Sequence, residues 1–136
     1  MKIEQAAWQT LSRQMRGRWW SQRIEDKHSV GVPDVVCMLN GQHIWLELKA
    51  ARDCQEPLKI RRSQIIWMTE CNAAGGVCIL LTRCDSVWYG IRVTNKVRVK
   101  IFLRKRVDVD WLVAIGAKSG KDPEQLLNSL MKEHIK

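Results

Sequence analysis

Two short runs of apolar and β-branched residues, 35–39 and 43–48, flank an Asn-Gly dipeptide. Asn-Gly supplies the positive φ angles that a two-residue type I′ turn requires, so this pattern predicts a β-hairpin. The turn also sets the pairing of the two strands. Counting back from it places Asp34 directly opposite Glu47.

Alternation along the second strand of this hairpin separates a polar face from an apolar one. The polar face carries Trp45, Glu47 and Lys49, and the apolar face carries Ile44, Leu46, Leu48 and Ala50. We therefore expect two carboxylates and an amine to lie within a few ångströms on one face, while the reverse face anchors the hairpin in a core.

The remaining hydrophobic pattern predicts helices and strands around this hairpin. Helices are expected over residues 2–16, over residues 59–72, and from Asp122-Pro123 onward, and strands over residues 18–25, 77–81 and 86–93. The predicted order is αβββαββ, which describes an α/β fold with a mixed sheet flanked by helices.

Residues 97–107 alternate again, and they predict a further strand. Basic and aromatic residues would lie on one face and aliphatic residues on the other: Arg98, Lys100, Phe102, Arg104 and Arg106 against Val97, Val99, Ile101 and Leu103. Such a strand has a core side and a side suited to phosphates. It could equally be an edge strand that its charges protect from aggregation.

Length and composition favour a single soluble domain. A chain of 136 residues with 46% hydrophobic residues can bury a core. We expect a soluble protein with no membrane partner, because there is no long apolar run and the amino terminus lacks the apolar segment of a signal peptide. The five cysteines are an odd number with no Cys-x-x-Cys pair, so packing thiols are expected.

A net charge of +9 is large for a chain of this size. It indicates a polyanionic partner, since the summed field attracts phosphates over long distances. Together with the acidic hairpin, it favours a nucleic acid.

The opposed carboxylates suggest the chemistry. Like charges placed directly opposite each other destabilise a sheet, so something must offset the repulsion between Asp34 and Glu47. Oxygen ligands on a rigid strand pair suit Mg²⁺ (or Mn²⁺), and Lys49 would lie beside the ion, placed to orient or deprotonate an attacking water. The alternative is that Asp34 is a turn residue and that Glu47 and Lys49 form a solvated strand face.

The Gly-Val-Pro-Asp segment at 31–34, the hairpin and the Glu-Leu-Lys segment at 47–49 resemble the PD-(D/E)xK nuclease superfamily, and within it most closely the VRR-Nuc branch and the phage or archaeal Holliday junction resolvases. The resemblance covers about residues 1–92. It implies a restriction-endonuclease-like core, with residues 93–136 as a C-terminal extension. We assign Asp34, Glu47 and Leu48 as metal ligands.

The resemblance also implies further site residues. Family members often carry an accessory acid on the first helix, which would be Glu4, although Glu25 is a competing candidate. Gln64 resembles the glutamine that this branch carries near the metal or the scissile phosphate, while an ordinary core-helix residue is the alternative. Arg61 and Arg62 suit backbone phosphates.

These expectations combine into a Mg²⁺-dependent endodeoxyribonuclease that selects branched or Holliday junction DNA by shape. The DNA-binding residues would be Arg61, Arg62, Arg98, Lys100, Arg104 and Arg106. The alternatives are a non-catalytic nucleic-acid-binding module and a sequence-specific restriction-type enzyme. We also expect a homodimer that uses exposed tryptophans and the leucines 126, 127 and 130, although a monomer could bury the last helix in its own core. The expected location is the cytoplasm of a bacterium or a phage-infected cell.

Overall fold

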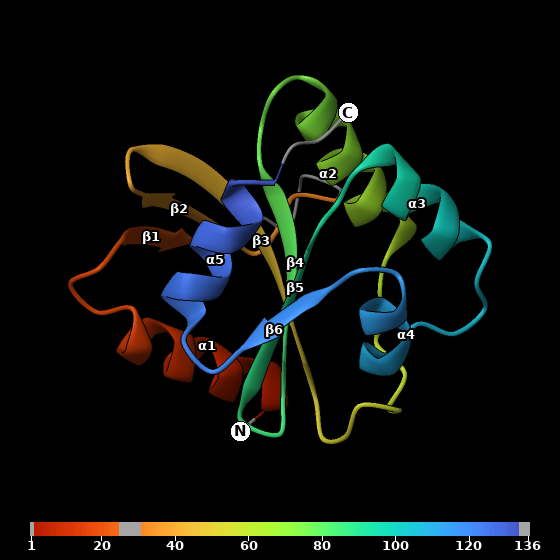
Figure 1. Ribbon diagram of the computed structural model, residues 1–136, viewed down its shortest axis with the longest axis horizontal. Coiled ribbons are helices and arrows are strands. Elements are labelled where there is room, and N and C mark those ends of the chain that lie inside the picture. The colour runs from red at the N-terminus through yellow and green to blue at the C-terminus, as the bar shows by residue number, and fades with distance from the viewer. Residues whose placement is uncertain (1, 25–30, 134–136) are drawn as a thin grey trace.

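One six-stranded sheet runs through the middle of the molecule in the computed structural model, which describes residues 2–24 and 31–133 (Figure 1). The strands lie in chain order, from β1 to β6. The elements are α1 (Ile3–Gln14), β1 (Trp20–Arg23), β2 (Val35–Leu39), β3 (Gln42–Ala51), α2 (Arg62–Ala73), β4 (Cys78–Cys84), β5 (Val87–Arg92), α3 (Asn95–Phe102), α4 (Val109–Ala114), β6 (Lys118–Gly120) and α5 (Pro123–Met131). The predicted αβββαββ order and the mixed, helix-flanked sheet are confirmed.

The β2–β3 hairpin has the predicted register. Val35 pairs with Leu46, and Leu39 pairs with Gln42. The turn residues Asn40 and Gly41 have φ angles of 52° and 77°, as a type I′ turn requires.

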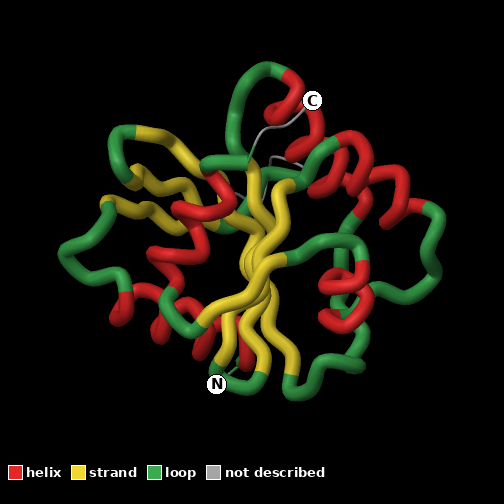
Figure 2. The backbone as a smooth tube through the Cα atoms, in the orientation of Figure 1, coloured by secondary structure: helices red, strands yellow, loops and turns green. Residues whose placement is uncertain are grey.

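Helix α2 connects β3 to β4, and these two strands are parallel, whereas every other pair in the sheet is antiparallel. Helices cover both faces of the sheet, as Figure 2 shows. Helices α1 and α5 pack with the side chains of Ile44, Leu46 and Leu48. Helices α2, α3 and α4 cover the other face, toward which Glu47 and Lys49 point.

The strand predicted over residues 97–107 is wrong, because this segment forms α3 and a following loop. The hydroxyl of Thr94 caps the helix by accepting a hydrogen bond from the Val97 amide at 3.3 Å. Val97 and Ile101 are buried one helical turn apart, so the same residues that alternate along a strand also make one face of a short helix. The basic residues therefore do not share a strand face.

Helix α5 begins as predicted, with the Asp122 carboxylate accepting a hydrogen bond from the Glu124 amide at 3.0 Å. Its leucines 126, 127 and 130 are buried at 4%, 0% and 1% exposure within the chain's own core. They cannot serve as exposed interface material, and that part of the dimer expectation is corrected. The reason is that Gly90 has no side chain and leaves room for Leu130 over β5.

Two short elements, α4 and β6, have no counterpart in the predicted set. Six and three residues are too few for a periodic hydrophobic signal. Within residues 2–24 and 31–133, no helix is both long and apolar enough to cross a membrane.

Candidate active site

Asp34 stands immediately before β2 and is held against the neighbouring strand. Its Oδ2 accepts a hydrogen bond from the Leu48 amide at 3.2 Å, and its carbonyl accepts one from the Ile24 amide at 2.7 Å. These two bonds fix the carboxylate beside Glu47, where the hairpin register predicted it. The side chain of Leu48 lies in the core, so only its main-chain carbonyl could contact an ion here.

Glu47 and Lys49 form an ion pair inside the protein. The Lys49 Nζ lies 3.3 Å from the Glu47 Oε2, and the two residues are only 7% and 1% exposed, respectively. Burial, followed by repulsion from Asp34, raises the pKa of Glu47 to about 7, although Lys49 pulls it down. The solvated strand face considered above is therefore wrong for these two residues.

Gln64, in the first turn of α2, is also buried on this side of the sheet, at 7% exposure. The Oε1 atoms of Gln64 and Glu47 are both buried without a hydrogen-bond partner among the described residues. Most buried oxygens in folded proteins have a partner, because an unsatisfied one costs about 1–3 kcal/mol. A bound cation is a ligand that could give such oxygens a partner.

Gly31 explains why α2 begins so close to Asp34. Its φ of 88° is a left-handed conformation, and a side chain there would collide with the backbone of Ser63, the residue before Gln64. The loop that carries Asp34 thus lies directly on the start of α2.

Trp45 and Trp67 add an edge-to-face contact with ring centroids 5.0 Å apart, which packs α2 onto β3.

Thr82 is a candidate site residue that the hydrophobic pattern did not single out. It pairs with Lys49 in the parallel register of β3 and β4, so the two side chains share a face. Its hydroxyl is buried without a hydrogen-bond partner among the described residues. The available signal was a polar residue directly after an apolar run, Val-Cys-Ile-Leu-Leu.

The donor set fits a hard divalent cation. The carboxylates of Asp34 and Glu47 are oxygen ligands, and Gln64 adds an amide oxygen from the helix side. Mg²⁺ and Mn²⁺ prefer such ligands over nitrogen or sulfur. A cation here would satisfy the unpartnered oxygen of Glu47 and offset the repulsion between the two acids.

The two candidates for the accessory acid fall in different places. Glu4 is exposed on α1, and α1 packs on the sheet face opposite the one that carries Glu47 and Lys49. Glu25 lies outside the described residues. The accessory role of Glu4 stays a prediction.

Basic residues surround the start of α2. Arg61 and Arg62 are exposed, and the first turn of this helix has no acidic residue and no side-chain cap. Positive side chains at a helix amino terminus oppose the helix dipole, which is unfavourable in the free protein. A bound anion would interact favourably with both the side chains and the dipole. Arg62 stacks on Phe102 of α3, with 3.9 Å between its Cζ and the ring centroid.

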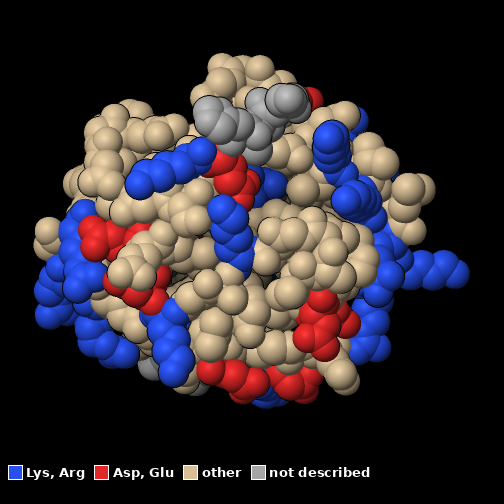
Figure 3. All heavy atoms as spheres, viewed as in Figure 1, with Lys and Arg blue, Asp and Glu red and all other residues tan. Residues whose placement is uncertain are grey.

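Lys and Arg gather along the right edge of Figure 3, where Figure 1 places α3 and the loop after it. Lys100 is exposed there and Arg98 is half-buried. Arg104 and Arg106 also have structural roles: Arg104 stacks on Trp111, and Arg106 pairs with Asp108 at 3.8 Å. Part of their charge is therefore used within the fold.

No family model matches the sequence, and no curated protein matches it. Among solved structures, the chain is similar to Hjc of Archaeoglobus fulgidus, described as a Holliday junction resolvase from an archaeal hyperthermophile. The TM-score is 0.61 at 12% identity, and the match covers 93% of this chain and 98% of Hjc. The chain has the restriction-endonuclease-like fold.

Proposed function

We propose that this protein is a metal-dependent endodeoxyribonuclease that hydrolyses phosphodiester bonds at the carboxylate site, defined as Asp34, Glu47, Lys49 and Gln64. One observation carries the proposal: two carboxylates are held side by side with a buried lysine, and buried oxygens of Glu47 and Gln64 have no partner within the described residues. The like charges and the unsatisfied oxygens both lower the stability of the folded protein, so this arrangement favours a function over a purely structural role.

Each residue of the carboxylate site has a role in this proposal. Asp34, Glu47 and the main-chain carbonyl of Leu48 would hold Mg²⁺ or Mn²⁺, which supplies Lewis-acid polarisation of a phosphoryl oxygen when bound. Lys49 carries a positive charge into a nearly dry site, where it can orient the attacking water and stabilise the charge that develops on the phosphate. Gln64 approaches from α2, and its amide oxygen would contact the same ion or one of its waters.

The surface beside this site supports DNA as the substrate. The start of α2 offers backbone amides, a favourable dipole and two exposed arginines, 61 and 62, which together form an anion site. Arg98 and Lys100 extend the positive surface along α3. These contacts address phosphates, so we infer that binding depends on shape and charge rather than on base sequence.

Branched DNA is the finer part of the proposal. It rests on the likeness of the fold to Hjc, whose own description is a Holliday junction resolvase, and on the resemblance to the VRR-Nuc branch. Resolving a four-way junction symmetrically needs two active sites related by a two-fold axis, so we propose a homodimer. With the α5 leucines buried, Trp20 on the edge strand β1, at 53% exposure, is the better interface candidate.

The test is cleavage of end-labelled linear, nicked, flap and four-way DNA with Mg²⁺, with Mn²⁺ and with chelator, together with sedimentation at micromolar concentration. We expect metal-dependent cuts, strongest on the four-way junction, from a dimer. Binding without cleavage in either metal would favour a non-catalytic binding module. A monomer that prefers flaps would overturn the hypothesis of a junction resolvase and leave the proposal of a nuclease standing.

A further inference from the structure

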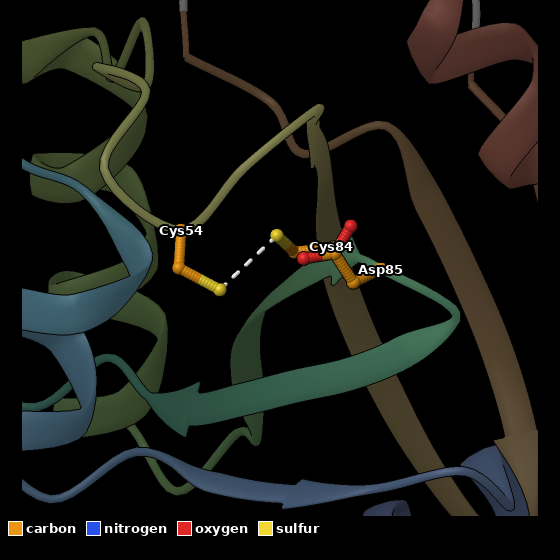
Figure 4. A group of neighbouring side chains, drawn as sticks. All are labelled: Cys54, Cys84 and Asp85. Carbon is orange, nitrogen blue, oxygen red and sulfur yellow. Dashed lines mark hydrogen bonds between the residues drawn. The ribbon is translucent and has the colours of Figure 1, made fainter.

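A second cluster of ligand atoms lies where β3 and β4 end, away from Asp34. Cys54 and Cys84 point their sulfur atoms at each other, and the carboxylate of Asp85 lies next to them (Figure 4). The two Sγ atoms are 3.2 Å apart, and the ligand atoms of all three residues lie within 4.8 Å of one another. Cys84 is buried, Cys54 is half-buried and Asp85 is exposed, so the cluster opens to solvent on one side.

Two segments far apart in the sequence build this thiol site, defined as Cys54, Cys84 and Asp85. Cys84 pairs with Ala51 at the end of the parallel β3–β4 ladder. Cys54 follows Ala51 by three residues, and its side chain lies beside that of Cys84. The Cys54 carbonyl accepts a hydrogen bond from the Asp110 amide at 3.0 Å. Asp85 has a φ of 51° in the β4–β5 turn, which fixes its position next to Cys84.

We propose that the thiol site binds a soft divalent cation of the zinc class, held by the sulfur atoms of Cys54 and Cys84 and the carboxylate of Asp85. Two thiolates and a carboxylate are ligands that Zn²⁺ takes, with a fourth tetrahedral position left for water. Two sulfur ligands of one tetrahedral Zn²⁺ stand about 3.8 Å apart, so the pair needs to open by only about half an ångström.

The local charge favours a cation although the chain as a whole is strongly basic. Burial, followed by contact with the Cys54 thiol and repulsion from Asp85 and Asp53, raises the pKa of Cys84 to about 12. The carboxylates that repel a thiolate attract a metal ion.

A second close pair of thiols provides a comparison within the same chain. Cys71 and Cys78 are also neighbours, and burial followed by the contact with Cys71 raises the pKa of Cys78. The positive charge of Arg92 acts on Cys78, and no carboxylate completes a group of three ligands with this pair among the described residues. Only the pair with an acid beside it is expected to bind metal.

The position of the thiol site indicates what the ion does. Cys54 lies in the segment between β3 and α2, and Cys84 and Asp85 lie at the β4–β5 turn. An ion bound to all three would fasten the start of this crossover to the sheet. We therefore expect the ion to be structural and to raise the melting temperature of the protein, because it binds the folded state alone.

The experiment is a titration of the reduced, metal-free, full-length protein with Co²⁺ and then Zn²⁺, followed by absorption. We expect one equivalent of Co²⁺ to give a thiolate-to-cobalt charge-transfer band that Zn²⁺ removes. The Cys71→Ser variant should keep the band, whereas Cys54→Ser should lose it. The Glu47→Gln variant should keep it as well, which separates this site from the nuclease proposal.

Asp85→Asn is the second variant, and it tests the carboxylate without disturbing the fold. Asparagine tolerates a positive φ, so the turn should form normally. We expect Zn²⁺ affinity, measured by competition with a chromophoric chelator, to fall at least about tenfold, as when a metal-ligand interaction is lost. No band in the wild type, a Cys54–Cys84 disulfide under reductant in place of the band, or unchanged affinity in Asp85→Asn would overturn the proposal.

Discussion

Glu47 and Cys84 are buried acids on neighbouring strands of one sheet, yet they differ in the charges around them. Both are 1% exposed, and burial is the largest cause of the raised pKa in each. Glu47 has Lys49 at 3.3 Å, which opposes the effect of burial and leaves its pKa at about 7. For Cys84, the contact with Cys54 and repulsion from Asp85 and Asp53 all add to the effect of burial, and its pKa rises to about 12.

This difference separates two kinds of cation site. The carboxylate site contains its own positive charge, so Glu47 can ionise near neutral pH and offer oxygens to a hard ion. The thiol site combines two thiols with a carboxylate, and these ligands suit a softer cation. Each site can therefore be perturbed while the other serves as the reference.

Replacing Asp34 by Asn or Lys49 by Ala should give the largest effect. Asp34 would hold the metal ion and Lys49 would act on the attacking water and the phosphate, so loss of either group should slow single-turnover cleavage on the order of a hundredfold or more. Affinity for DNA should stay within about twofold, since binding depends on the arginines and lysines at the surface. Cobalt binding at the thiol site should not change. Cleavage close to the wild-type rate in either variant would remove that residue from the site.

Gly31→Ala should disturb the carboxylate site by displacing the backbone, and it should leave the thiol site unchanged. An added Cβ would collide with the Ser63 backbone at a φ of 88°, which should move the Asp34 loop away from α2. Displacing a catalytic group by about an ångström can cost up to about a hundredfold in rate. Gly75→Ala is the matched control, because it has a φ of 98° but open space around it. Equal rates and equal melting temperatures for the two variants would contradict the account.

The pH dependence of stability should report Glu47. Its pKa is raised from 4.5 to about 7 in the folded state, so the native protein holds this proton more tightly than the unfolded chain does. The stabilisation is fully present below pH 4.5 and is lost as the pH rises toward about 7. Urea unfolding of the metal-free protein should therefore show a falling contribution over this window. Glu47→Gln should lack that contribution, and an identical pH slope in both proteins would refute it.

The salt dependence of DNA binding should give the smallest effect. Each neutralised phosphate contributes about −0.9 to the slope of log K against log salt on duplex DNA. Replacing Arg61, Arg62 and Lys100 together by Gln should flatten the slope by up to about three such contacts. Replacing Arg104 and Arg106 should do less, because those side chains also stack on Trp111 and pair with Asp108. The reverse ranking would place the DNA elsewhere on the surface.

The hairpin was predictable from the sequence because its information is local. An Asn-Gly turn and the alternation of two short runs set the register, and the register alone brings Asp34 beside Glu47. The segment over residues 97–107 failed for the opposite reason. Alternating aliphatic residues also match helical spacing there, and the Thr94 cap together with burial of Val97 and Ile101 decided for the helix.

Other features depend on tertiary contacts that no local pattern reports. The hydroxyl of Thr82 is placed beside Lys49 by the parallel register of β3 and β4. Cys54 and Cys84 are 30 residues apart and lack metal-ligand spacing, so only the folded chain brings them together. The sequence alone leaves open whether the α5 leucines pack against a partner or in the chain's own core, and the room that Gly90 leaves for Leu130 favours the core.

The most direct test of the central claim compares two variants that make the same chemical change. Glu47→Gln removes a carboxylate from the proposed active site, and Glu70→Gln removes an exposed one from α2. Both should be assayed with Mn²⁺ on a labelled four-way junction under single-turnover conditions. The account predicts wild-type cleavage by Glu70→Gln and a loss on the order of a hundredfold or more by Glu47→Gln. Equal cleavage by the two variants, or no cleavage of DNA by the wild type, would contradict it.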